Sequence, residues 1–242
     1  QRISLIGFVI LLLSPFSVSW AQAPEWSNGL VWYQIFPERF RNGDLTNEPN
    51  KERARGPEGW SLSSWTSDWY ARAQWEQQAT PNFYDIVRER RYGGDLQGVI
   101  DQLDYLQDLG IGGIYFNPVF DAQSMHKYDA TYYHHIDRNF GPNPTADLTQ
   151  FANENPADPS TWAWSSADSL FLQLIQQAHQ RGIRVIIDGV FNHTGTEFWA
   201  FQHLLEHQEE SPYKHWYTVR SFDDPSTSEN EFDYEGWWGF KG

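Results

Sequence analysis

Residues 182–193 read Gly182-Ile183-Arg184-Val185-Ile186-Ile187-Asp188-Gly189-Val190-Phe191-Asn192-His193. Apart from Arg184, the residues between Gly182 and Asp188 are β-branched and apolar, which predicts a strand that is buried on both faces. Asp188 ends the run. An unpaired buried charge is costly, so this carboxylate needs a partner or a ligand unless it is a capping residue in an ordinary loop.

The same alternation of strand and helix continues toward the N-terminus. Apolar residues at helical spacing predict helices over about residues 166–180 and 96–109. Residues 111–116 and 30–36 are apolar, β-branched or aromatic and predict two further strands. Residues 41–92 and 121–165 are polar or rich in proline and are expected to be long loops.

Strands separated by helices predict right-handed βαβ units and a parallel sheet. Two α/β architectures compete, the doubly wound sheet and the (β/α)8 TIM barrel. Doubly wound nucleotide folds carry a glycine-rich turn after the first strand, where this chain has Phe36-Pro37-Glu38-Arg39-Phe40. Gly93-Gly94-Asp95 does not complete G-x-G-x-x-G. Long loops after the strands are typical of the barrel, whose functional residues lie in these loops.

Composition excludes several classes of function. The chain has 242 residues and a formal net charge of −15, so we expect neither nucleic-acid binding nor docking on an anionic membrane. There is no cysteine, which excludes disulfides, thiolate metal sites and a cysteine nucleophile. Aromatic residues make up 17%, which suits either a sugar-binding protein or an aromatic-rich core.

Residues 1–21 have the layout of a secretory signal peptide. Arg2 precedes an apolar run that is shorter than a membrane-spanning helix, and Ser19 and Ala21 are the small residues of a cleavage site. Cleavage after Ala23 and a retained membrane anchor are the alternatives. We expect a secreted or periplasmic protein that does not contact the membrane after cleavage.

Two loops carry candidate ligands. Residues 42–48 hold five oxygen-bearing side chains and one glycine, which indicates either a loop around a hard cation such as calcium or a solvated turn. His126 and Tyr128 are two residues apart in an extended segment. They are expected to point to one side and to contact one sugar ring, unless they lie in an ordinary surface loop.

Taken together, several motifs resemble the α-amylase superfamily, glycoside hydrolase family 13. The residues that carry the resemblance are Tyr33 to Phe40, Gly93 to Val99, Gly110-Ile111, His126-Lys127-Tyr128-Asp129 and the D-x-V-x-N-H pattern from Asp188 to His193. They follow the family's order over about residues 30–240, and the resemblance is strongest to the neopullulanase and cyclomaltodextrinase branch.

The resemblance implies roles for individual residues. Tyr128 would stack on the sugar at the cleavage subsite, His126 and His193 would bind its hydroxyls, and Asp188 would be a supporting carboxylate. Asn192 matches a position that binds calcium in many members. A separate calcium site of the branch would take the backbone carbonyl of Gly93 and five side chains as ligands, those of Asn42, Asp44, Asn47, Glu48 and Asp95. Glu48 stands where the branch usually has aspartate, so this ligand is in doubt.

The resemblance also implies which parts of the site lie elsewhere. Retaining glycosidases use two carboxylates about 5–5.5 Å apart, and in this family they follow the fourth and fifth strands. No G-x-R-x-D nucleophile motif occurs in this sequence. We therefore expect no catalytic residue in this segment, with residues 22–193 as the first three βα units of the barrel and residues 194–242 as the start of the inserted domain B. The segment alone is expected to be inactive and poorly folded.

The implied function of the parent protein is hydrolysis of α-1,4-linked glucans, such as starch, maltodextrin, cyclodextrin or pullulan, with retention. A transglycosylase on the same scaffold differs in how well it excludes water from the acceptor side. A non-catalytic glucan-binding protein is the third alternative. It would keep the sugar subsite and lack the two carboxylates.

Overall fold

The computed structural model describes residues 23–66 and 68–237. The predicted signal peptide lies outside the described residues. Two units are distinguished, residues 1–30 and residues 31–242; the described part of the first contains a short 3₁₀ turn at Glu25–Ser27. Within residues 23–66 and 68–237, none of the helices combines the length and the apolar character that crossing a membrane requires.

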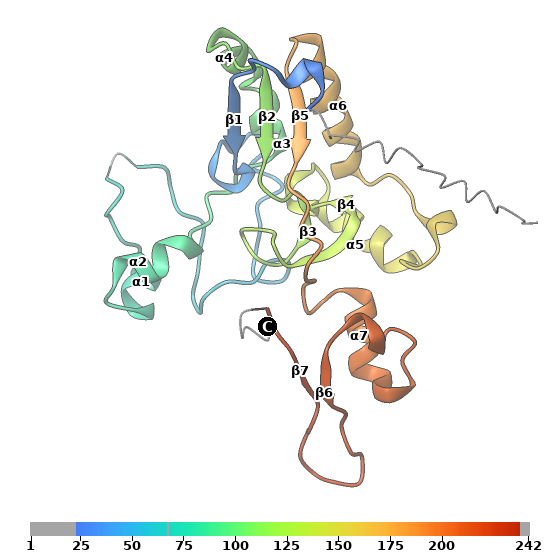
Figure 1. Cartoon of the computed structure of the whole chain (residues 1–242). Helices are drawn as coiled ribbons and strands as arrows, with labels where there is room; N and C mark the ends of the chain where they lie inside the picture. The colour runs from blue at the N-terminus through green and yellow to red at the C-terminus, as the bar shows by residue number, and fades with distance from the viewer. Residues whose placement is uncertain (1–22, 67, 238–242) are drawn as a thin grey trace, which may run out of the picture. The chain divides into compact units, whose positions relative to one another are not determined.

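Three parallel strands form the main sheet of the second unit (Figure 1). They are β1 (Trp32–Ile35), β2 (Gly113–Phe116) and β5 (Arg184–Ile187), with β2 in the middle. The register aligns Ile35 with Phe116 and Phe116 with Ile187. All three strands fall within the segments that the sequence predicts, and each is parallel to its neighbour.

The two faces of this sheet differ. Ile35, Ile114 and Phe116 are buried in the main hydrophobic cluster, because alternate residues of a strand point to the same face. On the opposite face, Trp32 and Ile186 are each 38% exposed. The expectation that the strands are buried on both faces is therefore wrong for β1 and β5, since the described helices pack on one face only.

Three helices supply much of the rest of the main core. They are α3 (Leu96–Ile100), α4 (Leu103–Asp108) and α6 (Ser166–Gln180). Ser165 caps α6 by accepting the N–H of Asp168, whose carboxylate accepts the Ser165 N–H in return. Helix α6 contacts α3 and β5. The predicted helix 96–109 is interrupted at Asp101 and Gln102 and becomes two short helices.

The long segments between these elements are more regular than the sequence indicates. The first contains α1 (Gln74–Ala79) and α2 (Phe83–Ile86). The second contains an antiparallel hairpin of β3 (Phe120–Ala122) and β4 (Ala130–Ile136), followed by α5 (Pro144–Asn153). Short 3₁₀ turns occupy Pro37–Arg39, Val87–Glu89, Arg138–Phe140, Pro159–Thr161, Gln208–Glu210 and Lys214–Trp216.

Residues beyond His193 have a hydrophobic cluster of their own. Helix α7 (Trp199–His207) buries Phe201 and Leu204 against aromatic residues on and around β6 (Val219–Ser221) and β7 (Asp233–Tyr234). Tyr133 of β4 also packs against this cluster. The boundary at residue 194 stays a prediction.

Candidate functional site

The predicted sugar-binding residues meet where the parallel strands end. The Tyr128 hydroxyl donates to Asp188 Oδ2 at 3.0 Å, and Asn117 Nδ2 donates to the same hydroxyl at 3.4 Å. Gln34 of β1 in turn donates to Asn117 Oδ1 at 2.9 Å. Partial burial and the neighbouring Asp188 carboxylate raise the pKa of Tyr128, so its phenol stays protonated as a donor. Asp188 thus has the partner that its sequence context demands.

A tight turn orients His126 beside Tyr128. The two ring centroids lie 5.8 Å apart, but a turn brings them together and not the extended segment that the sequence predicts. His126 Nδ1 accepts the Tyr128 backbone N–H at 3.1 Å. In the neutral imidazole the proton is therefore on Nε2, which is a donor suited to a sugar hydroxyl. Burial lowers the pKa of His126 and favours this neutral form.

Lys127, between these two residues, holds the turn from inside. Its φ of 61° lies in the left-handed region, which directs its side chain inward. The ammonium is fully buried and lies 2.7 Å from Asp137 Oδ2, and it donates to the Ala122 carbonyl at 3.0 Å. Burial raises the pKa of Asp137, but Lys127 outweighs this and holds that pKa below its usual range. The buried ion pair therefore fixes where His126 and Tyr128 point.

His193 makes different contacts from the other predicted sugar ligands. Its ring stacks on Trp237 with centroids 5.0 Å apart, and its carbonyl accepts the Tyr133 hydroxyl at 2.7 Å. Asn192 Nδ2 lies 2.8 Å from His193 Nδ1. Tyr128, His126 and Asp188 are thus brought together by direct contacts, whereas His193 is tied to β4 and to the segment around β7.

The six residues of the predicted calcium site lie together. Asp95 accepts the backbone N–H groups of Gly43 and Asp44, the latter at 2.8 Å, and the side-chain amide of Asn47 at 3.3 Å. Asn42 Nδ2 donates to Glu48 Oε1 at 3.3 Å. A Cβ at Gly93 would lie 2.9 Å from Asn42 Nδ2, so this glycine adjoins the same loop.

Two atoms of this loop show that it fits a hard cation. Asn42 Oδ1 and Asn47 Oδ1 are buried, and neither accepts a hydrogen bond from the part of the chain that the structure describes. A buried carbonyl oxygen without a donor is costly, and calcium takes amide and carboxylate oxygens as ligands. The Asp95 carboxylate also caps α3 by accepting the Gly98 N–H at 2.6 Å. Its Oδ1 also accepts the Gly43 N–H, and its Oδ2 accepts those of Asp44 and Asn47. Asp95 would therefore bind an ion by giving up one of these bonds, of which the 3.3 Å bond from Asn47 is the longest.

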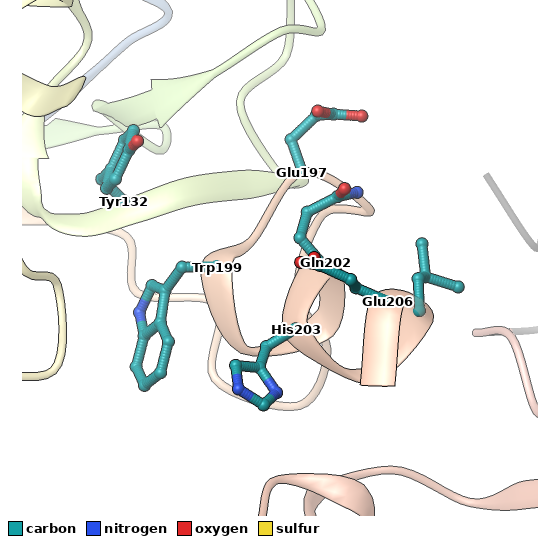
Figure 2. A pocket seen from close by; sticks show the side chains of 7 residues that line it. Tyr132, Glu197, Trp199, Gln202, His203 and Glu206 are labelled. Carbon is teal, nitrogen blue, oxygen red and sulfur yellow. The ribbon is translucent and has the colours of Figure 1, made fainter. Parts of the chain in front are cut away.

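A separate hollow of about 660 Å³ lies elsewhere in the molecule (Figure 2). Its lining comes from Tyr132 of β4 and from the region of α7, and consists of Tyr132, Glu197, Trp199, Gln202, His203, Leu205 and Glu206. None of the predicted site residues lines it. This hollow is therefore separate from the contacts at the strand ends.

Sequence reasoning missed several residues of the site. Gln34 and Asn117 connect β1 and β2 to Tyr128. Tyr115 also belongs to the site, because burial and, to a smaller extent, Asp188 raise its pKa. Their common signal is position: each lies at or next to the carboxyl end of a parallel strand, where barrel enzymes place functional side chains. Lys127 belongs to the motif His126-Lys127-Tyr128-Asp129, but nothing in its spacing indicates a buried partner.

Comparison with known proteins decides the family. Residues 34–155 and 166–241 match the sequence family described as "Alpha amylase, catalytic domain". The chain belongs to the alpha-amylase family. It is 38% identical to Neopullulanase 2 of Thermoactinomyces vulgaris over 210 residues, which are 87% of this chain and 27% of that protein. It is 39% identical to a cyclomaltodextrinase of Geobacillus thermopakistaniensis over 201 residues, 83% of this chain and 26% of that protein.

The alpha-amylase resemblance, including the neopullulanase and cyclomaltodextrinase branch, is therefore confirmed. The chain spans about a quarter of the length of these curated relatives, 27% and 26%. Among solved structures, the cyclic alpha-maltosyl-(1→6)-maltose hydrolase of Arthrobacter globiformis is similar, with a TM-score of 0.59 and 28% identity over 90% of this chain and 37% of that one.

A solved structure named cyclomaltodextrinase has a TM-score of 0.55 and 34% identity over 83% of this chain and 26% of that one. The three parallel strands are thus strands of the family's (β/α)8 barrel, and the predicted fold class is confirmed. In a closed barrel, the face of the sheet that lies away from the helices points into the interior.

Proposed function

We propose that this chain forms the sugar-binding part of a glycoside hydrolase that cleaves α-1,4-linked glucans. The observation that carries the proposal is the contact between Tyr128 and Asp188, with His126 beside it, at the carboxyl ends of barrel strands. Similar proteins named neopullulanase and cyclomaltodextrinase support the substrate class. Starch, maltodextrin, cyclodextrin and pullulan remain the candidate substrates.

In this proposal each residue has a distinct role. The Tyr128 ring covers the apolar face of one sugar, while the Nε2–H of His126 donates to a hydroxyl. His193 binds a second hydroxyl of the substrate. Asp188 acts as a supporting carboxylate that accepts from Tyr128. It is not assigned as the nucleophile, because a retaining mechanism needs two carboxylates about 5–5.5 Å apart.

The proposal is tested on the full-length protein, that is, the reading frame that contains this chain, expressed to its stop codon. Incubation with maltotriose should give glucose and maltose, and NMR of the fresh product should show the α-anomer, as retention requires. Longer oligomers would indicate a transglycosylase. Binding without any new product would indicate a non-catalytic glucan-binding protein and would overturn the hydrolase proposal.

Substitution of Tyr128 tests the sugar subsite. Tyr128→Ala should raise the Kd for acarbose about 10- to 100-fold, because covering an aromatic side chain is worth about 1.5–3 kcal/mol. Tyr128→Phe keeps the ring and should stay within about threefold. Tyr105→Ala is the matched control, since Tyr105 is an exposed tyrosine of α4. Titration calorimetry measures the Kd of acarbose for all three variants and the unmodified protein. An unchanged Kd in Tyr128→Ala would show that Tyr128 does not belong to the subsite.

We also propose that the loop of residues 42–48 binds calcium together with Gly93 and Asp95. The support is the pair of buried, unpartnered oxygens Asn42 Oδ1 and Asn47 Oδ1. The ion would act structurally, because its ligands join this loop to the start of α3.

Calcium is therefore expected to stabilise the full-length protein. At 100 times its Kd, a ligand that binds only the folded state adds about 2.7 kcal/mol. Asp44→Asn removes one negative charge at constant size and should reduce the rise in Tm on adding calcium while the Tm in EDTA stays near that of the unmodified protein. Asp101→Asn, on the exposed surface of the same region, is the control. A calcium response unchanged by Asp44→Asn would exclude this loop.

Export remains a proposal that rests on residues 1–21 alone. One relative, 37% identical, is named "Intracellular maltogenic amylase" of Bacillus subtilis (strain 168), so the test has to separate the two locations. N-terminal sequencing of the protein from a secreting host should begin at Gln22. An uncleaved protein in the cytosol would overturn the proposal.

A further inference from the structure

Strand β4 contains an irregularity that gathers two histidines. Phe120 pairs with Ile136, but the next residue of β3, Asp121, pairs with Tyr132. One step along β3 therefore matches four steps along β4, and residues 133–135 form a bulge. Neighbours in a regular strand point to opposite faces, whereas here the rings of His134 and His135 lie 4.3 Å apart. Bulges are known to redirect side chains at functional sites.

Glu154, at the end of α5, completes the cluster. Its Oε2 lies 2.8 Å from His135 Nε2 and 3.5 Å from His134 Nε2. Its other oxygen accepts from Gln150 Nε2 at 3.1 Å and from the Ala163 N–H at 3.0 Å. These two bonds hold the carboxylate in place, so Oε2 is presented to the histidines.

His134 brings an unsatisfied atom to this cluster. Its Nε2 is buried and forms no hydrogen bond within residues 23–66 and 68–237. Trp162 stacks on the ring with centroids 4.0 Å apart and planes 15° apart, which limits its rotation. A buried nitrogen without a partner is costly in a purely structural network, but it is what a metal ligand requires before the ion binds.

Asp168 sets the tautomer of His135. Its Oδ2 lies 2.8 Å from His135 Nδ1, and the same carboxylate accepts the N–H groups of Ile136 and Ser165. An ionised carboxylate only accepts, so His135 carries one hydrogen on Nδ1 toward Asp168 and another on Nε2 toward Glu154. Loss of the Nε2 hydrogen leaves the tautomer with the hydrogen on Nδ1. A carboxylate that accepts the second N–H of a histidine is the usual support of a metal-binding imidazole.

We propose that His134 Nε2, His135 Nε2 and Glu154 Oε2 bind one divalent transition-metal ion of the zinc type, with Asp168 supporting His135. All three ligand atoms lie within 4.8 Å of one another. Zinc bonds of about 2.0–2.2 Å place tetrahedral ligands about 3.3 Å apart, so small side-chain shifts suffice. Two imidazoles favour such an ion over calcium or magnesium, which take oxygen ligands.

The ion would clamp three elements together. It would join β4 to the end of α5, and through Asp168 to the start of α6 (Figure 1). When it binds, it replaces the proton on His135 Nε2, which leaves to solvent. The fourth coordination position remains for water or for another ligand.

Cobalt(II) is the probe for this site, because its visible absorption reports coordination by nitrogen. The full-length protein is prepared without a histidine tag, stripped with EDTA, saturated with calcium to fill the oxygen site, and titrated with cobalt and then zinc. His134→Ala and Glu154→Gln should each remove one equivalent of cobalt binding or weaken it at least about 100-fold, since even supporting residues contribute about 10- to 100-fold. Glu154→Gln keeps the Oε1 contacts, and circular dichroism checks the fold.

The other histidine pair of the chain provides the control. His203 and His207 lie on α7 with ring centroids 4.2 Å apart, and His203 lines the hollow shown in Figure 2. His203→Ala/His207→Ala should leave the cobalt spectrum of the proposed site unchanged. Loss of the spectrum in this control, an unchanged spectrum in both site variants, or no cobalt binding at all would overturn the proposal.

Discussion

Lys127→Met is expected to lower the free energy of unfolding by about 3–5 kcal/mol, because removing one partner of a buried ion pair leaves the other charge uncompensated. For a domain of this size the Tm should fall on the order of 10 °C. Both are measured on the full-length protein by thermal denaturation. Met has nearly the length of Lys, so the loss of charge dominates over the loss of packing.

The surroundings of Asp137 explain why the structure cannot adapt to this change. Lys127 and Asp137 are both 0% exposed. Asp137 also accepts the backbone N–H groups of Ala122 and Asn139 at 3.0 and 2.9 Å, so its carboxylate cannot turn toward solvent. The bonds from Ala122 and Asn139 remain in the variant while the ammonium is gone. The buried carboxylate loses its ion-pair partner and keeps only the electrostatic attraction of Arg138.

The variant should also weaken sugar binding. Lys127 lies between His126 and Tyr128, and its left-handed backbone depends on an inward side chain. Without the ion pair, the turn loses the contact that aims both rings. The KM for maltotriose should rise more than kcat falls, because Lys127 is fully buried and would act only through the two rings proposed to bind the sugar.

Two further variants separate the ion pair from general effects. Lys51→Met removes an exposed lysine and should change stability by less than about 0.5 kcal/mol. Adding Asp137→Asn to Lys127→Met removes the orphaned charge and should recover part of the lost stability. A Lys127→Met protein with an unchanged Tm would show that the pair is not buried as described.

The sequence predicts the sheet better than its loops. The strand at residues 183–187 is recognisable because it is a short, almost continuous run of β-branched apolar residues between Gly182 and Asp188. The β3–β4 hairpin was not predicted, because its turn has no glycine and Lys127 takes the left-handed conformation instead. That conformation depends on a partner, Asp137, ten residues away, which no local pattern reveals.

The candidate site was predicted in the same uneven way. The rings of His126 and Tyr128 do lie close together, but the expected extended segment is wrong, because a turn at left-handed Lys127 brings them together. The pairing of His134 with His135 contradicts strand alternation, so only the bulge in β4 reveals it. Gln34 and Asn117 are also not predicted as site residues, because nothing in the local sequence distinguishes an amide side chain at a strand end from one in an ordinary loop.

The glycines of residues 93–98 also had a role that the sequence did not reveal. They do not complete the G-x-G-x-x-G motif of a phosphate-binding loop. In the structure they allow the backbone of residues 93–98 to contact the backbone of residues 37–43. A Cβ at Gly94 would lie 1.9 Å from the Pro37 carbonyl oxygen, and one at Gly98 would lie 2.0 Å from that of Arg41. Both are therefore positions where a single methyl group should have a large effect, and Gly98 is the one that lies within a helix.

Gly98→Ala is expected to destabilise the protein by about 3 kcal/mol, since overpacking costs about 1–3 kcal/mol and here the obstacle is backbone. Gly98 lies within α3, where alanine alone would stabilise by about 1 kcal/mol, so the two effects oppose each other. At 2.0 Å the Arg41 oxygen must move, and it accepts the Asp95 N–H at 3.1 Å. The clash therefore outweighs helix propensity.

The displacement should extend to the loop of residues 42–48, which we propose binds calcium. Arg41 directly precedes Asn42, and a Cβ at Gly43 would lie 2.3 Å from the Gly98 nitrogen, so the loop and α3 are packed backbone to backbone. Gly98→Ala should lower the Tm in EDTA and also weaken the calcium response, whereas Asp44→Asn changes only the latter. Gln97→Ala, on the partly exposed side of α3, should change neither. A Gly98→Ala protein more stable than the original would mean that helix propensity dominates and that the two backbones are not in contact.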